Sequence, residues 1–292
     1  MTKHVLVTGG KGQLGRSIQK IAGNFDTCRF TFIDQEELDL TDAAKTRGCL
    51  LEIHPDYVIN CAAYTAVDKA ESDTETCYAV NAGIPALLGH LAEELGYRLI
   101  HLSTDYVYDG NLAVPHTENM SPLPRSVYGK SKLAGEQNLF LNPNVIILRT
   151  SWLYSEFGHN FLRTMLRLGD EKSRIGVVYD QAGTPTYAGD LAAALMEIIA
   201  HTEKNGFVPG VYNYSNEGVC SWYDFACEIM FLSGKPCRVS PLLTSEYPLP
   251  APRPVYSVMD KSAIRKTFHL EIPYWRDSLR SVIDNMTKKK EI

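Results

Sequence analysis

The start of the chain combines a short apolar run, a glycine-rich turn and a helix-like segment, in that order. Val5-Leu6-Val7 leads into TGGKGQLG at residues 8–15, and residues 16–22 follow as a helix-like stretch that stops at Gly23. Glycines in such a turn let the backbone approach a pyrophosphate at the helix N-terminus. The order therefore predicts a dinucleotide-binding β-α-β unit. A plain glycine turn is the alternative, because the spacing G-x-x-G-x-x-G differs from the commoner G-x-G-x-x-G. The residues expected at the cofactor are Gly9, Lys11, Gly12, Gln13, Leu14 and Gly15.

The second strand is predicted at residues 30–33, and Asp34 lies at its end. A carboxylate there accepts hydrogen bonds from the adenosine ribose and repels a 2′-phosphate, which favours NADH. Lys11 and Arg16 lie near the first turn and could instead receive that phosphate. The sequence therefore predicts NADPH or NADH as cofactor and leaves the choice open.

Strand-like and helix-like segments alternate as far as residue 150. Residues 57–60, 99–102 and 145–149 predict the third, fourth and fifth strands. This order predicts an α/β fold with a doubly wound parallel (Rossmann) sheet, in which ligands bind beyond the carboxyl ends of the strands. Further cofactor contacts are expected from Asp39 and Leu40 (with a helix-start role as the alternative for Asp39) and from Ala62, Ala63 and Tyr64.

The stretch SVYGKSK at residues 126–132 places Tyr128 and Lys132 four residues apart, on one face of a predicted helix. A nearby ammonium lowers the pKa of a phenol from about 10 toward the working pH of a catalytic acid. Thr104, at the end of the fourth strand, has a hydroxyl that could bond a substrate carbonyl beside Tyr128. With 16 tyrosines in the chain, one such pair is expected by chance. The pair therefore indicates catalysis only together with the glycine turn and Thr104, and an ordinary surface helix is the alternative.

The regular alternation ends after residue 150. We predict a dinucleotide-binding domain at 1–150, to which 174–205 return, and a smaller mixed α/β substrate-binding lobe from 151–173 and 206–292. The lysines at 288–290 are expected to form a solvated tail.

Composition excludes several classes of partner. The net charge of -5 gives no general attraction to nucleic acid, and no apolar run of 18 residues predicts a membrane span. The N-terminus lacks the pattern of a signal peptide. The 7 cysteines are odd in number and contain no Cys-x-x-Cys pair, which favours reduced thiols and a cytoplasmic protein.

Four stretches together resemble the extended short-chain dehydrogenase/reductases that act on nucleotide sugars. They are residues 8–15, 62–71, 103–108 and 128–136. In the second half, the stretches at 149–154, 160–161, 180–186, 222–224 and 252–254 resemble the dTDP-4-dehydrorhamnose reductase subfamily.

This resemblance implies reduction of the C4 keto group of a dTDP-linked 4-keto sugar, dTDP-4-dehydro-L-rhamnose. Tyr128 would donate the proton, Lys132 would lower its pKa and hold the nicotinamide ribose, and Thr104 would bond the carbonyl oxygen. The resemblance also implies a sugar-nucleotide site formed by Thr65, Val67, Thr104, Asp105, Tyr106, Trp152, Asn160, Gln181 and Arg253. For Trp152 a place in the core, and for Arg253 a surface ion pair, are the alternatives.

Two departures from related patterns narrow the expectation. In the resemblance to sugar-nucleotide dehydratases, the end of strand four would read Thr-Asp-Glu, with the glutamate as the base for elimination. Tyr106 stands in its place here, which favours simple reduction. Some rhamnose-pathway reductases form a metal-bridged dimer, but Ser17 and Gly189 stand where carboxylates are needed. We therefore expect no metal and a monomer or weak homodimer.

Two other functions stay open. One is a reductase or epimerase of another nucleotide-linked keto sugar. The other is a non-catalytic dinucleotide-binding subunit that resembles the regulatory β subunit of methionine adenosyltransferase.

Overall fold

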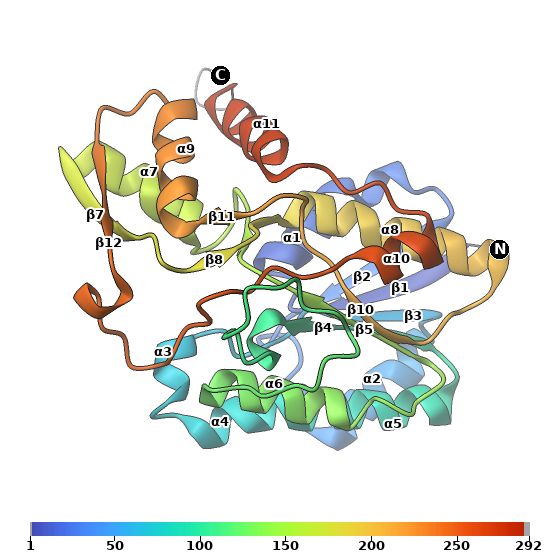
Figure 1. Cartoon of the computed structure of the whole chain (residues 1–292). Coiled ribbons are helices and arrows are strands. Elements are labelled where there is room, and N and C mark those ends of the chain that lie inside the picture. The colour runs from blue at the N-terminus through green and yellow to red at the C-terminus, as the bar shows by residue number, and fades with distance from the viewer. Residues whose placement is uncertain (1, 289–292) are drawn as a thin grey trace.

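The computed structural model describes residues 2–288, and its centre is a six-stranded sheet in the order β10-β5-β4-β3-β1-β2. Neighbouring strands of this sheet all pair in parallel. The prediction of a doubly wound α/β sheet is confirmed (Figure 1). Its strands are β1 (Lys3–Thr8), β2 (Cys28–Ile33), β3 (Tyr57–Asn60), β4 (Arg98–Thr104), β5 (Val145–Thr150) and β10 (Gly210–Asn213).

Helices cover both faces of the sheet (Figure 1). One face carries α1 (Gln13–Ile21), α8 (Ala188–Asn205) and α10 (Ser262–Phe268). The other carries α2 (Ala43–Ile53), α5 (Ile84–Leu95) and α6 (Val127–Gln137). The central strands are buried on both faces, which is why their sequences are continuous apolar runs rather than alternating ones.

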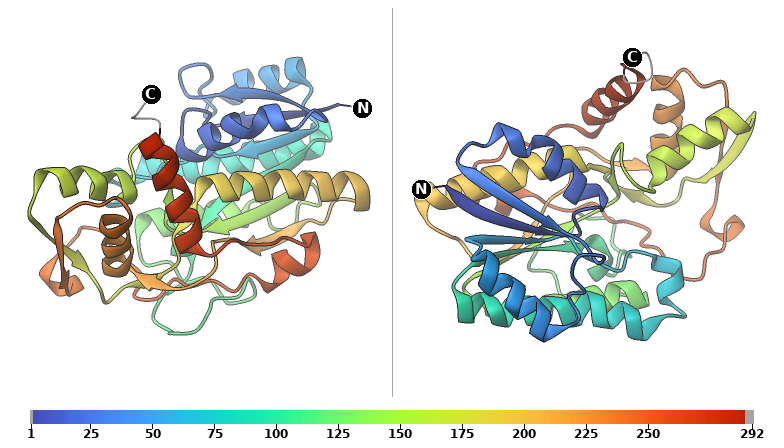
Figure 2. Two further views of the ribbon diagram at one scale, coloured as in Figure 1. Left: turned by 90° about the horizontal axis from the view of Figure 1, so that it is seen from above. Right: turned by 180° about the vertical axis from the view of Figure 1, so that it is seen from behind.

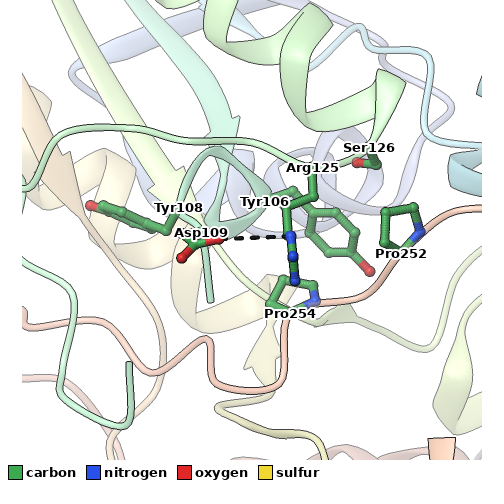
Figure 3. A pocket seen from close by; sticks show the side chains of 7 residues that line it. All are labelled: Tyr106, Tyr108, Asp109, Arg125, Ser126, Pro252 and Pro254. Carbon is green, nitrogen blue, oxygen red and sulfur yellow. Dashed lines mark ion pairs between the residues drawn. The ribbon is translucent and has the colours of Figure 1, made fainter. Parts of the chain in front are cut away.

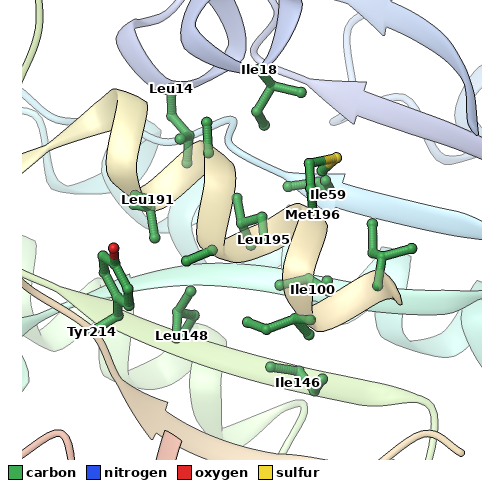
Figure 4. Close-up of a cluster of buried hydrophobic side chains, with 14 of the residues drawn as sticks. Leu14, Ile18, Ile59, Ile100, Ile146, Leu148, Leu191, Leu195, Met196 and Tyr214 are labelled. Atoms are coloured by element: carbon green, nitrogen blue, oxygen red, sulfur yellow. The ribbon is translucent and has the colours of Figure 1, made fainter. Parts of the chain in front are cut away.

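The core below α8 shows how the strands hold that helix. Ile100 of β4 and Leu148 of β5 are fully buried with Leu195 of α8 (Figure 4). Burying one such side chain contributes about 1.5–3 kcal/mol. The next residues along the strands, such as Val58 and Leu99, face a separate core with α5. Successive side chains of each strand point to opposite faces of the sheet, so one strand packs against both helical layers.

Residues 74–95 form one helical stretch that a π-helical turn interrupts. It consists of α4 (Thr74–Tyr78), a π-helical turn (Ala79–Gly83) and α5. Asn81 lies in the π turn and is 1% exposed. Such turns re-aim a side chain within a helix. The remaining short helical elements are α3 (Val67–Ala70) and 3-10 turns at Ala22–Asn24, Asp105–Val107 and Thr244–Glu246.

A smaller lobe projects from one end of the sheet (Figure 2). It has its own core, in which Phe225 and Trp275 are buried and pack edge to face. Its helices are α7 (Phe161–Glu171), α9 (Trp222–Leu232) and α11 (Trp275–Lys288). Its strand pairs are β7 (Arg174–Val178) with β12 (Arg238–Leu242), β8 (Ala182–Gly183) with β11 (Cys220–Ser221), and β6 (Leu153–Tyr154) with β9 (Thr186–Tyr187).

Four strands lie on the opposite side of the predicted domain division, namely β7, β8, β9 and β10. β7 was expected with the dinucleotide-binding part but pairs with β12 in the lobe. Its residues are alternately buried and exposed, as in a strand with one covered face. β10 was expected in the lobe but pairs with β5 at the edge of the large sheet. The division as a whole stays a prediction.

Within residues 2–288, every helix is too short or too polar to cross a membrane. The lysine tail predicted at 288–290 lies outside the residues whose side chains are described.

Candidate active site

The glycine turn lies where β1 separates β2 from β3, which is the switch point at which parallel sheets bind ligands. Gly9 has a positive φ of 63°, and a Cβ there would lie 2.9 Å from the backbone nitrogen of Ala62. A Cβ on Gly15 would clash with the carbonyl oxygen of Gly9. The turn therefore packs against the end of β3 and against the start of α1. Its geometry fits a pyrophosphate, because Gly12 lies at the N-terminus of α1, where backbone N–H groups are free to bind an anion.

Helix α6 begins at Val127 because two side chains cap it. Ser126 Oγ accepts a hydrogen bond from the nitrogen of Gly129 at 3.0 Å. Glu71 Oε1 accepts one from the nitrogen of Val127 at 2.8 Å. Capping groups of this kind satisfy backbone donors that the helix itself leaves free.

Two glycines let α6 lie close against its neighbours. A Cβ on Gly129 would clash with the carbonyl oxygen of Tyr106, and one on Gly135 with that of Asn81. The first contact brings the helix onto the 3-10 turn after β4. Tyr128 is thereby placed beside Thr104, as the sequence predicted.

The phenol of Tyr128 hydrogen-bonds with the Thr104 hydroxyl, and its ring packs edge to face on Tyr106 with centroids 5.5 Å apart. Burial raises the pKa of Tyr128 to about 12, although the Thr104 hydroxyl acts in the opposite direction. The expected lowering of this pKa by Lys132 is therefore wrong for the structure as it stands. The physical reason is that burial of the phenol dominates its pKa, while Lys132 Nζ donates to the carbonyl oxygen of Leu102 at 2.6 Å.

Lys132 is a buried cation with only 2% of its surface exposed. Burial lowers its pKa to about 8, and the Glu136 carboxylate partly opposes that shift. An ammonium has three donors, and the Leu102 carbonyl accepts from one of them. Lys132 can therefore still donate to a hydroxyl placed above the end of β4.

Asp105 is a buried carboxyl next to Thr104. Thr104 Oγ1 donates to Asp105 Oδ1 at 3.1 Å and accepts from the nitrogen of Tyr106 at 3.2 Å. Burial raises the pKa of Asp105 to about 7, with hydrogen bonds from Ser257 and Thr104 acting against it. The direction of the Thr104 proton thus depends on the charge of Asp105.

A buried ion pair supports α6 from below, and sequence reasoning gave neither partner a role. Arg149 Nη2 lies 2.6 Å from Glu136 Oε2, and the two side chains are 1% and 0% exposed. Ser103 donates to the same carboxylate, and Arg149 Nη1 donates to the Tyr108 hydroxyl at 2.9 Å. Glu136 follows Lys132 by one helical turn, and that spacing was the available signal.

Asn81 is a second residue that sequence reasoning missed. Its Nδ2 donates to Ser131 Oγ of α6 at 3.0 Å, and its Oδ1 accepts from the nitrogen of Tyr64 at 2.9 Å. It therefore joins the catalytic helix to the segment after β3. An asparagine in an alanine- and leucine-rich helix was the signal.

Arg253 forms a two-pronged ion pair with Asp68. Its Nη1 and Nη2 lie 2.7 Å from Asp68 Oδ1 and Oδ2, respectively. The pair joins the proline-rich segment of the lobe to α3. This is the carboxylate contact that the sequence offered as the alternative, and a role in substrate binding stays a prediction.

A small cavity opens beside the start of α6, and the prolines on either side of Arg253 in the sequence line it (Figure 3). Asp109 and Arg125 pair on its wall at 3.7 Å. Its lining consists of Tyr106, Tyr108, Asp109, Arg125, Ser126, Pro252 and Pro254.

Trp152 stacks flat on Trp222, with ring centroids 3.6 Å apart and planes at 10°. Its φ of 47° is unusual for a bulky residue and indicates local strain. A Cβ on Gly183 would touch both Trp152 and Ser257. Since Ser257 hydrogen-bonds Asp105, Trp152 lies near Tyr128 and Thr104, and its contact with the sugar stays a prediction.

Asn160 and Gln181 have hydrogen-bond partners within the protein. Asn160 caps α7 through Arg163, and its Nδ2 donates to Gln13 of the glycine turn at 2.9 Å. Gln181 Nε2 donates to Thr244 at 3.0 Å in the lobe. Their predicted contacts with substrate stay predictions.

The other predicted cofactor and substrate residues lie around the same sheet edge. Asp39 accepts from the nitrogen and hydroxyl of Thr41 at 2.9 and 2.7 Å, and α2 is capped by Asp42 instead. Leu40 is 7% exposed and belongs to the core, so its side chain is not open to a ligand. Ala62, Ala63, Tyr64, Thr65 and Val67 form the segment after β3 that leads into α3. The part of the chain described, residues 2–288, holds no group of three or more candidate metal ligands.

The family description "RmlD substrate binding domain" matches residues 3–288. The chain is 38% identical to a dTDP-4-dehydrorhamnose reductase of Aggregatibacter actinomycetemcomitans, over 95% of this chain and 97% of that protein. It is also 38% identical to the spore coat polysaccharide biosynthesis protein SpsK of Bacillus subtilis, over 97% of each.

Solved structures give the same result. A dTDP-4-dehydrorhamnose reductase of Bacillus anthracis, in complex with NADP, superposes with a TM-score of 0.93 at 36% identity, over 98% of this chain and 100% of that one. The orthologue from Clostridium acetobutylicum gives 0.91 at 41% identity, over 97% and 99%. The chain therefore belongs to the RmlD family, as an NAD(P)H oxidoreductase of the dTDP-4-dehydrorhamnose reductase-like type.

Proposed function

We propose that the protein reduces the C4 keto group of dTDP-4-dehydro-L-rhamnose to give dTDP-L-rhamnose. The observation that carries this proposal is the placement of Tyr128 against Thr104, with Lys132 buried one helical turn away. This group lies at the carboxyl end of β4, on the edge of the sheet that carries the glycine turn. Relatives named as reductases of this sugar support the choice of substrate.

In the proposed mechanism, the glycine turn and the N-terminus of α1 would hold the dinucleotide, and Lys132 Nζ would donate hydrogen bonds to its ribose hydroxyls. The nicotinamide supplies the hydride when it is bound. Tyr128 keeps its proton at neutral pH, because its pKa is raised to about 12, and donates it to the alkoxide. A cation brought near the phenol by ribose binding would then ease that release.

Thr104 and Asp105 complete the proposed centre. With Asp105 neutral, the Thr104 hydroxyl is released from the carboxylate and can donate to the carbonyl oxygen of the sugar. A positioned donor of this kind stabilises negative charge as it develops. The high pKa of Asp105, about 7, supports a neutral form being available near neutrality.

The lobe supplies the proposed sugar-nucleotide contacts. Trp152 would pack on the sugar ring, and Arg253 suits a diphosphate because its forked donors match two oxygens. All seven cysteines are unpaired, which supports a reducing compartment such as the cytoplasm.

The test measures cofactor oxidation with dTDP-4-dehydro-L-rhamnose for the natural protein and for Tyr128→Phe. General acid catalysis contributes about 10²- to 10⁴-fold, so the variant should lose about 10³-fold in kcat. Tyr274→Phe, at an exposed tyrosine, is the matched control and should keep full activity. Full activity in Tyr128→Phe would remove the assigned proton donor.

A second candidate is reduction of another dTDP-linked keto sugar. A Streptomyces antibioticus relative, named as a probable 4-ketoreductase of dTDP-4,6-dihydroxy-2-methyloxan-3-one, is also 38% identical. A panel of dTDP-linked 4-keto sugars, ranked by kcat/KM, separates the two. Cofactor binding with no turnover of any of these sugars, together with a co-purifying enzyme, would favour a regulatory subunit instead.

A further inference from the structure

Three carboxylates gather where the glycine turn meets the end of β2. Glu36 and Glu37 pair with the side chain of Lys11, and Asp34 accepts a hydrogen bond from its backbone nitrogen. Lys11 Nζ lies 3.1 Å from Glu37 and also forms an ion pair with Glu36. The group therefore holds three negative charges and one positive charge. In this fold, the end of the second strand is the place that meets the adenosine ribose.

Hydrogen bonds fix this corner to the turn. Asp34 Oδ2 accepts from the nitrogen of Lys11 at 2.7 Å, and Asp34 Oδ1 accepts from that of Gln35 at 2.8 Å. The nitrogen of Asp34 donates to Glu37 Oε2 at 2.9 Å. The nitrogen of Gly10 donates to the carbonyl oxygen of Ile33 at 2.9 Å. Backbone donors thus hold Asp34 and Glu37 in place, and the carboxylate of Asp34 lies against the turn.

Both cations that could receive a 2′-phosphate have other partners. Lys11 pairs with two glutamates. Hydrogen bonds from Glu36 and Glu37 raise the pKa of Lys11, and Lys11 in turn lowers the pKa of Glu37. The Arg16 guanidinium lies 4.3 Å from the centre of the Phe157 ring, which directs it toward the lobe. A 2′-phosphate carries up to two further negative charges and would meet a corner that is already net negative.

We propose that Glu36 and Glu37, acting with Asp34, make this enzyme prefer NADH to NADPH. They bind the lysine that would otherwise hold the 2′-phosphate, and they repel that phosphate. The proposal rests on the cofactor use stated above, and it adds two residues that determine which of the two cofactors binds.

The experiment measures the dissociation constants of NADH and NADPH for the full chain, by calorimetry, without any sugar. The natural protein should bind NADH at least about tenfold more tightly at low ionic strength, and the gap should narrow with added salt because these charges are exposed. The double variant Glu36→Gln, Glu37→Gln should reduce the ratio of the NADPH to the NADH dissociation constant about tenfold. Glu93→Gln, an exposed glutamate of α5, is the matched control and should leave the ratio unchanged.

Two results would overturn the proposal. One is equal or tighter binding of NADPH by the natural protein at low salt. The other is an unchanged NADH-to-NADPH ratio in the double variant, which would assign the choice to Asp34 alone. Since the readout is binding, a failure to reduce the sugar would count against the proposed reaction and leave this inference standing.

Discussion

The two sides of the site are held by different forces. Beneath Tyr128, the side chains of Lys132, Glu136 and Arg149 are almost fully buried. Across the site, the lobe is tied to the sheet by the partly exposed ion pair of Arg253 and Asp68, and it carries the flat stack of Trp152 on Trp222. The buried side has no solvent to replace a lost partner, whereas the lobe side has. The reacting groups are therefore held rigidly, and the side proposed to bind the nucleotide sugar can adjust.

The largest effect is expected when one charge of the buried Glu136–Arg149 pair is removed. Glu136→Gln leaves Arg149 buried without its counter-ion and should lower the free energy of unfolding by about 3–5 kcal/mol. It should also lower the pKa of Lys132 further, since Glu136 raises it. Urea denaturation measures the first effect.

The matched control is Glu94→Gln, which breaks the exposed ion pair with Arg47. Its loss should be much smaller, because water solvates both groups. Equal losses in the two variants would contradict the claim that burial makes the Glu136–Arg149 pair the costlier one to break.

A second test uses the pH dependence of stability. Because burial raises the pKa of Asp105 from 3.8 to about 7, the folded state binds an extra proton between these values. That contribution is present at low pH and is lost as the pH rises through about 7. Relative to Asp105→Asn, the natural protein should therefore lose on the order of 3 kcal/mol between pH 4 and pH 7. Parallel stability curves for the two proteins would contradict the raised pKa.

A third test addresses the lobe. Arg253→Gln should raise KM for the sugar nucleotide about tenfold with kcat little changed, because a proposed phosphate contact is lost and the proton donor is intact. Arg280→Gln, an exposed arginine of α11, is the control. A fall in kcat with constant KM would place Arg253 with the reacting groups instead.

The smallest expected effect is at the aromatic stack. Trp222→Ala removes the partner that holds Trp152 and should raise KM for the sugar roughly threefold, since such pairs contribute about 0.5–1.5 kcal/mol. Cofactor affinity should stay the same. Phe231→Ala changes an exposed aromatic on the same helix and should alter neither constant.

What the sequence predicted well depends on local pattern. The alternating strands and helices up to residue 150, and the meeting of Thr104 with Tyr128, follow from short motifs and from the rule for parallel sheets. The pairing of Glu136 with Arg149 could not be predicted, because α6 and β5 meet only in the folded sheet. The rise in the pKa of Tyr128 was missed for a similar reason, since burial is a property of the whole fold.

Strand pairing after residue 150 could not be predicted either. β7 and β10 are short, and neither carries a signal of which sheet it will join. Their partners, β12 and β5, lie more than sixty residues away along the chain, as the registers Arg174–Arg238 and Gly210–Ile146 show.

The two glycines that let α6 approach its neighbours also weaken it as an independent helix. Each glycine costs about 1 kcal/mol of helix stability relative to alanine. A peptide covering α6 alone should therefore be mostly unstructured in water. Tyr128 and Lys132 come into register only once β4 and the π turn are in place to receive the helix. During refolding, enzymatic activity should thus return last, after the spectroscopic signal of the sheet. A shortened fragment of the chain should have no enzymatic activity.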